Sequence, residues 1–105
     1  MIKRVVCLVG LLALSACASH SLKLRDDSLH LYLKADAAER VEFAASTEGY
    51  APRPATRLKR GRWEVVMPGD ASFSYYYLID GQVYAPDCRY REQDDFGGDN
   101  CIYQP

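Results

Sequence analysis

The chain has 105 residues, of which 49 % are hydrophobic and 26 % are charged, and its formal net charge is −1. This composition excludes a disordered charged tail and a collagen-like repeat, and the length excludes a multi-domain enzyme. The sequence therefore predicts one small globular domain.

The N-terminus has the layout of a secretory signal, because two basic residues precede the unbroken apolar stretch 5–14. That stretch is too short to span a bilayer as a mature helix. It is followed by Leu14-Ser15-Ala16-Cys17, which resembles a bacterial lipobox, where a precursor is cut just before a cysteine that carries lipid. We predict a lipoprotein signal peptide over residues 1–16 and lipidation of Cys17. The alternative is a plain secretory signal that is cut elsewhere.

Lipid on Cys17 predicts that the protein is permanently anchored in a membrane, because each buried methylene of an acyl chain contributes about 0.8 kcal/mol to membrane binding. Ala18 and Ser19 follow without an aspartate, and by resemblance to enterobacterial lipoproteins this indicates the outer membrane. The predicted location is therefore the bacterial cell envelope, with the domain either periplasmic or exposed at the surface. Without the signal the chain has 11 basic and 14 acidic residues, a net charge of −3, which argues against nucleic acid as a partner.

The cysteines predict one disulfide in the mature chain. Cys7 leaves with the signal and Cys17 carries lipid, so Cys88 and Cys101 remain, and an oxidising compartment favours their pairing. Closing so short a loop stabilises a small domain by roughly 3 kcal/mol. Two thiols without nearby histidines do not make a metal site, so we expect neither a metal nor a cofactor.

Residues 17–27 are predicted to be the lipidated N-terminus and a polar tether, and residues 28–105 to be the folded domain. Apolar and polar residues alternate with a period of two over 29–34, 41–45, 63–67 and 73–79, which is typical of half-buried strands. Asp80-Gly81 is the strongest hairpin signal, because both positions tolerate positive φ. Short strands without a long helix predict an all-β fold, an immunoglobulin-like antiparallel β-sandwich.

Two charged stretches each allow two interpretations. The basic one either attracts anionic lipid headgroups or a phosphorylated glycan, or is a solvated loop; it contains Arg53, Arg57, Lys59, Arg60 and Arg62. The acidic one either binds calcium or marks a tight turn before a last strand; it contains Glu92, Asp94, Asp95 and Asp99 around Phe96-Gly97-Gly98. The favoured interpretations are the solvated loop and the turn.

The residues contain no recognisable catalytic set, because His20 falls in the predicted tether and His30 in a strand. We therefore predict that the protein is not an enzyme. Strand alternation places Tyr75 and Tyr77 in the core and turns Tyr76 to the opposite face. An outward tyrosine either stacks on a sugar ring or covers a neighbouring strand.

A series of motifs follows in a recognisable order: Val41-Glu42-Phe43-Ala44-Ala45-Ser46, Gly61-Arg62-Trp63-Glu64-Val65, Pro68-Gly69, Tyr75-Tyr76-Tyr77-Leu78-Ile79-Asp80-Gly81-Gln82 and Asp94-Asp95-Phe96-Gly97-Gly98-Asp99-Asn100. With these motifs, residues from about 29 to 103 resemble the glycogen-binding module of the AMP-activated protein kinase β subunit and the related family 48 carbohydrate-binding modules. The resemblance implies an immunoglobulin-like sandwich without catalysis.

The resemblance also implies a set of sugar-binding residues. Family members stack sugars on two tryptophans and contact hydroxyl groups with a lysine and an asparagine. The first tryptophan position is Tyr50, the lysine position is Tyr76, and the asparagine is Asn100. The second tryptophan position is Val83, which cannot stack, and the neighbouring Tyr84 points to the other strand face. We expect a carbohydrate-binding platform of Tyr50, Tyr76 and Asn100.

The sequence thus predicts a non-catalytic envelope lipoprotein that binds an α-glucan or another glycan weakly. Two other functions remain open: a module that docks an envelope protein, and a small inhibitor of an envelope hydrolase.

Overall fold

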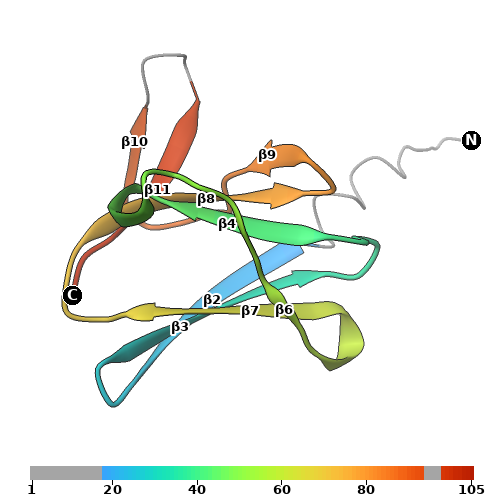
Figure 1. The fold of residues 1–105 in the computed structure, drawn as a ribbon, viewed down its shortest axis with the longest axis horizontal. Coiled ribbons are helices and arrows are strands. Elements are labelled where there is room, and N and C mark those ends of the chain that lie inside the picture. Colours follow the sequence, from blue (N-terminus) through green and yellow to red (C-terminus); the bar gives the residue numbers. More distant parts are fainter. Residues whose placement is uncertain (1–17, 94–97) are drawn as a thin grey trace, which may run out of the picture.

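The computed structural model describes residues 18–93 and 98–105, and its strands form two antiparallel sheets packed face to face (Figure 1). The strands are β2 (Ala18–Arg25), β3 (Ser28–Ala35), β4 (Val41–Ala45), β5 (Arg53–Pro54), β6 (Thr56–Arg57), β7 (Arg62–Pro68), β8 (Phe73–Ile79), β9 (Gln82–Tyr84), β10 (Arg91–Gln93) and β11 (Asp99–Tyr103). Short 3-10 turns lie at η1 (Ser46–Glu48) and η2 (Lys59–Gly61). Among the described residues, one sheet has the order β10-β11-β8-β4-β5, with β9 also beside β8, and the other has the order β2-β3-β7-β6. The predicted all-β antiparallel sandwich is confirmed.

The four-stranded sheet contributes alternate apolar residues of β3 and β7 to the core. Leu31 pairs with Val65 and Leu33 pairs with Trp63, and none of these four side chains is more than 5 % exposed. Directly opposed side chains on one face of an antiparallel pair pack against each other. Each buried leucine of this kind stabilises the fold by about 1.5–3 kcal/mol.

The six-stranded sheet contributes an aromatic cluster to the same core. The ring of Phe43 lies 5.4 Å from that of Tyr75 and 5.3 Å from that of Tyr77, measured between centroids. Tyr75 and Tyr77 are each 1 % exposed, as the alternation along β8 predicted. These rings belong to the same hydrophobic core as the buried residues of β3 and β7.

The β8–β9 hairpin forms at the predicted place. Asp80 and Gly81 have φ values of 50° and 84°, and both residues of a type I′ turn need positive φ. The Asp80 carboxylate also accepts hydrogen bonds from the backbone N–H groups of Glu39 and Arg40, at 2.9 Å and 2.8 Å. The hairpin tip is thereby joined to the connection between β3 and β4.

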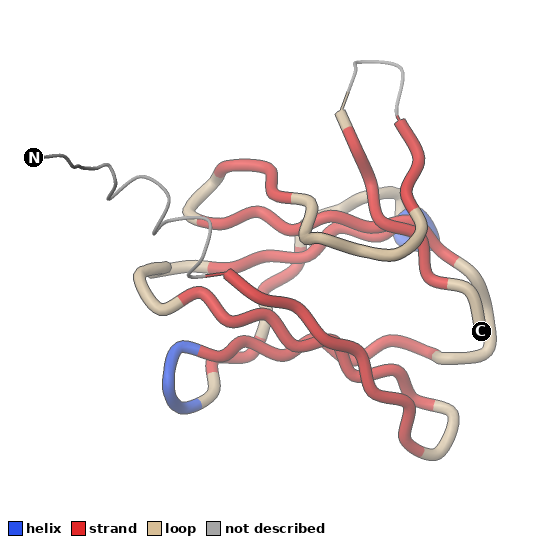
Figure 2. The backbone as a smooth tube through the Cα atoms, turned by 180° about the vertical axis from the view of Figure 1, so that it is seen from behind, coloured by secondary structure: helices blue, strands red, loops and turns tan. Residues whose placement is uncertain are grey.

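Residues 18–25, which were expected to be part of a tether over 17–27, instead form a strand. β2 pairs with β3 along its whole length, from Ala18 opposite Ala35 to Arg25 opposite Ser28, as the view from behind also shows (Figure 2). Asp26 and Asp27 have φ values of 47° and 68°, so they make a tight two-residue hairpin turn. The folded domain therefore includes residues 18–27, which were expected to be a tether.

Candidate functional site

Tyr50 is placed by a tight turn that follows β4. Gly49 and Tyr50 both have left-handed backbone conformations, with φ values of 65° and 59°. The N–H of Tyr50 donates a hydrogen bond to the carbonyl of Ala45 at 2.8 Å, and the N–H of Gly49 donates one to Ser46 at 3.1 Å. A left-handed tyrosine is uncommon, so these bonds are needed to hold it. The turn brings the Tyr50 ring back toward the sheet.

Tyr76 lies on the outer face of the six-stranded sheet. It is opposite Ala44 on β4, and it is half-buried, whereas its neighbours Tyr75 and Tyr77 are in the core. The prediction that Tyr76 points away from the core is confirmed.

Tyr50 and Tyr76 stack on each other, and we name them the tyrosine pair. Their ring centroids are 5.7 Å apart and their planes differ by 15°. Both residues are partly exposed. Two nearly parallel phenol rings at this spacing make an offset stack, which is a favourable aromatic geometry. The pair presents a ring surface and two hydroxyl groups at one place on the sheet.

Asn100, the third predicted residue, lies on β11 and is not open to solvent. Its neighbour Cys101 is opposite Tyr75, where the pairing of β11 with β8 ends, and Asn100 itself is opposite Glu92 on β10. Asn100 is only 5 % exposed. The structure therefore brings Tyr50 and Tyr76 together, while the amide of Asn100 is covered and does not extend the exposed ring surface.

Val83 continues the outer face of the sheet beyond Tyr76. It is opposite Leu78 on β8, and residues 76 and 78 share a strand face. Its side chain is 66 % exposed, the largest value among the exposed large hydrophobic residues described. Tyr84 pairs with Tyr77 and packs against the core, so it faces away from this surface, as predicted.

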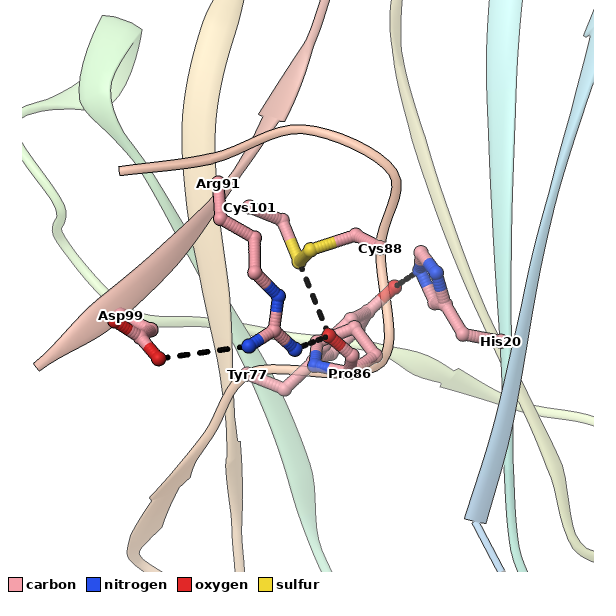
Figure 3. The surroundings of a disulfide bond; sticks show 7 residues. All are labelled: His20, Tyr77, Pro86, Cys88, Arg91, Asp99 and Cys101. Atoms are coloured by element: carbon pink, nitrogen blue, oxygen red, sulfur yellow. Dashed lines mark hydrogen bonds and ion pairs between the residues drawn. A yellow bond between two sulfur atoms is a disulfide. The ribbon is translucent and has the colours of Figure 1, made fainter. Parts of the chain in front are cut away.

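Cys88 and Cys101 form the predicted disulfide, with an S–S distance of 2.04 Å and a Cα–Cα distance of 5.9 Å. Figure 3 shows the bond beside the Pro86 carbonyl, to which Arg91 donates a hydrogen bond at 2.8 Å. Arg91 also contacts Asp99, with 3.4 Å between Nη1 and Oδ2. A disulfide in so small a domain is typical of proteins outside the cytoplasm.

His20 joins the two sheets through a polar contact that the sequence did not reveal. Its Nε2 lies 2.9 Å from the hydroxyl of Tyr77, across the interior from β2 to β8 (Figure 3). Burial lowers the pKa of His20 to about 4, so the ring is neutral at pH 7. Burial also raises the pKa of the Tyr77 hydroxyl well above its usual value. The alternation of His20, Leu22 and Leu24 with polar residues was the available signal for this strand.

A pocket of about 380 Å³ opens between β2 and the disulfide. Its lining combines aromatic and polar side chains; it includes His20, Tyr75, Cys88, Arg89, Tyr90 and Tyr103. Sequence analysis missed the pocket because one of its walls is β2, which was expected to be a tether.

The structure divides the predicted basic stretch into two parts. Arg53 belongs to β5 in the six-stranded sheet, where its Nε lies 3.1 Å from Oε1 of Glu48 and its Nη2 donates to the carbonyl of Val66. Arg57 and Arg62 belong to the other sheet, and their guanidinium groups lie over the rings of Trp63 and Tyr32 at 5.1 Å and 4.9 Å. The chain crosses from one sheet to the other between β5 and β6.

Several predicted features lie outside the described residues: the signal peptide over 1–16, Cys17, and Asp94, Asp95, Phe96 and Gly97 of the acidic stretch. Glu92 pairs with Asn100 in the β10–β11 hairpin. Over residues 18–93 and 98–105, no group of three or more His, Cys, Asp or Glu side chains is placed to hold a metal ion. In the same ranges no helix has the length and apolarity needed to cross a membrane.

No protein-family model matches the chain, and no curated protein sequence matches it. The resemblance to glycogen-binding modules therefore stays a prediction.

Proposed function

We propose that this chain is a non-catalytic lipoprotein of the bacterial envelope whose sandwich binds an α-glucan-like oligosaccharide weakly through the tyrosine pair. The observation that carries the proposal is the stacking of Tyr50 on Tyr76, at 5.7 Å and 15°, on the outer face of the six-stranded sheet. Pyranose rings have apolar faces that pack on aromatic rings, while tyrosine hydroxyl groups exchange hydrogen bonds with sugar hydroxyls.

The binding is proposed to be weak because few groups contribute. An aromatic contact adds about 0.5–1.5 kcal/mol beyond its buried area. The covered amide of Asn100 offers no direct hydrogen bond to a sugar above the rings, and Val83 provides no third ring. The proposed anchor compensates in part for the weak binding of a single domain, because many copies on one membrane can bind one polymer at several points.

The envelope location is supported by two features. The sequence Leu14-Ser15-Ala16-Cys17 directly precedes the first described strand, and the Cys88–Cys101 disulfide is typical of exported domains. Mass spectrometry of the protein purified from membranes tests the anchor: a mass that starts at Cys17 and includes acyl chains is expected. An unmodified N-terminus would refute lipidation without affecting the sugar proposal.

Affinity electrophoresis through gels with and without glycogen tests the sugar proposal. The parent protein should be retarded by glycogen, and Tyr76→Ala and Tyr50→Ala should each lose this retardation. Tyr90→Ala is the matched control, because Tyr90 is 48 % exposed and lines the pocket beside the disulfide rather than the tyrosine pair. Equal retardation of Tyr76→Ala and the parent protein would refute the role of the pair.

Docking of an envelope protein is the second candidate function. The exposed Val83 extends the outer face next to the tyrosine pair, and apolar side chains of this kind also fit a protein partner. Absence of glycogen retardation in the parent protein would favour this class. An inhibitor of an envelope hydrolase is a special case of it, and an unchanged lysozyme rate with excess domain would exclude that enzyme as the target.

A further inference from the structure

One end of the sandwich gathers the start of β2 and three chain connections, and we name it the anchor end. It consists of Ala18 and of residues 34–40, 57–62 and 80–81. The strand register brings these segments together, because Ala18 is opposite Ala35 and Lys34 is opposite Arg62. Asp80 completes the group through its hydrogen bonds to Glu39 and Arg40. Figure 1 shows the β2 start, η2 and the β8–β9 turn on the same side of the molecule.

The anchor end is positively charged on a negatively charged protein. It carries six basic and three acidic residues, a net charge of +3, while the chain from residue 17 onward has a net charge of −3. All six basic side chains are exposed; they are Lys34, Arg40, Arg57, Lys59, Arg60 and Arg62. The anchor end therefore has the opposite charge sign to the chain as a whole.

Most of these cations are not neutralised within the protein. Arg40 has an ion pair with Glu42, but within the described part of the chain no ion pair within 4 Å joins the other five to an acidic group. Two of the three acidic residues of the anchor end have neighbours other than these cations. The Asp80 carboxylate accepts a hydrogen bond from the backbone N–H of Glu39, and Asp36 packs against Gly61. Consecutive left-handed residues at Arg60 and Gly61 hold the η2 turn in a tight bend at the tip of this end.

We propose that the anchor end rests on anionic phospholipid headgroups. This inference builds on the proposed lipid anchor at Cys17, the residue directly before β2. Because β2 begins at Ala18, no linker separates the lipidated residue from a rigid strand, and the basic segments stay close to the bilayer surface. Anionic lipids attract nearby Lys and Arg side chains over about a Debye length, near 8 Å at physiological salt. The negative remainder of the chain is repelled, so the domain stands upright.

This orientation has a consequence for the tyrosine pair. β4 begins with Val41 next to the anchor end and ends at Ala45, where η1 and Tyr50 follow. Tyr50 therefore lies at the end of the sandwich that points away from the membrane, where a large polysaccharide can reach it.

Vesicle sedimentation tests the proposal on the mature chain, residues 17–105, with Cys17→Ser so that no lipid contributes. The probe is a set of phosphatidylcholine vesicles with or without 30 % phosphatidylglycerol, at low salt and at 0.5 M NaCl. Binding is expected only with phosphatidylglycerol and at low salt. Lys59→Glu combined with Arg60→Glu should weaken it at least twentyfold, given about fivefold for each basic side chain lost.

The matched control is Lys23→Glu with Arg25→Glu, which makes the same change in net charge on exposed residues of β2 near its far end. This variant should keep the binding of the parent chain. Absence of binding to phosphatidylglycerol vesicles, or an equal loss in both double variants, would overturn the proposal. Because the chain tested has no lipid, the result is separate from the mass spectrometry that decides whether Cys17 is acylated.

Discussion

His20 and Tyr77 form a hydrogen bond at 2.9 Å that connects the edge strand of one sheet to the central strand β8 of the other. The histidine is held neutral there, because burial lowers its pKa to about 4. A polar contact in the interior costs stability when one partner becomes charged or is lost.

This contact predicts a pH-dependent stability. The unfolded chain protonates His20 below about pH 6.5, whereas the folded chain does so only near pH 4, so unfolding takes up a proton in this range. The free energy of unfolding should therefore fall as the pH drops from 6.5 to 4, by up to about 3 kcal/mol. Urea titrations at several pH values measure it. His20→Phe should lose most of this slope between pH 6.5 and 5, and an unchanged slope would contradict the assignment.

Val83→Trp should strengthen the proposed binding to glycogen. Val83 is 66 % exposed on the face that carries Tyr76, so a larger ring there adds stacking surface without disturbing the core. One aromatic contact of about 0.5–1.5 kcal/mol corresponds to an affinity gain of roughly twofold to tenfold. Affinity electrophoresis measures the gain. Gln82→Trp, on the adjacent residue of β9, is the control, because its side chain points to the other strand face.

Removing the disulfide should destabilise the domain by about 3 kcal/mol, because the bond closes a short loop with a sequence separation of 13. For a domain of this size the expected drop in Tm is roughly 12–24 °C. Cys88→Ala with Cys101→Ala, followed by thermal unfolding, tests this value. Reductant should lower the Tm of the parent chain similarly and leave the variant unchanged, and a variant as stable as the parent would contradict the prediction.

Gly61→Ala should destabilise the fold more than Gly49→Ala. Both glycines have positive φ, 71° and 65°, so both substitutions carry the cost of a left-handed alanine, about 1–2 kcal/mol. At Gly61 a Cβ atom would also lie 2.8 Å from Cα of Asp36, whereas at Gly49 nothing lies within 4 Å. Chemical denaturation of the two variants measures the difference. Equal losses would mean that the β3–β4 connection moves aside at no cost.

Local patterns were sufficient to predict most of the fold. The alternation at Leu31 and Leu33 and the positive-φ turn at Asp80-Gly81 depend on residues that are close in sequence. The disulfide was predictable because the two remaining cysteines allow only one pairing. The edge strand β2 was missed because its residues are mostly polar and exposed, and an edge strand with one partner needs few apolar side chains.

The candidate site was predicted less completely, because it depends on contacts between distant segments. Alternation placed Tyr76 outward, but it does not show that Asn100 is covered by its surroundings. The basic stretch looked continuous in sequence, yet Arg53 and Arg57 belong to different sheets. The partnership of His20 with Tyr77 spans 57 residues and has no local signature.

The turn that carries Tyr50 leaves that ring little freedom, since its backbone is already fixed by hydrogen bonds to Ala45 and Ser46 and its face is already against Tyr76. A ligand that settles on it does not have to order a loose loop, which in other sites costs about 0.5–1.5 kcal/mol for each immobilised side chain. The few weak contacts with the ligand then contribute almost all of their interaction free energy to the affinity. Such a surface should bind and release a ligand rapidly, which fits the proposed binding of a long polymer.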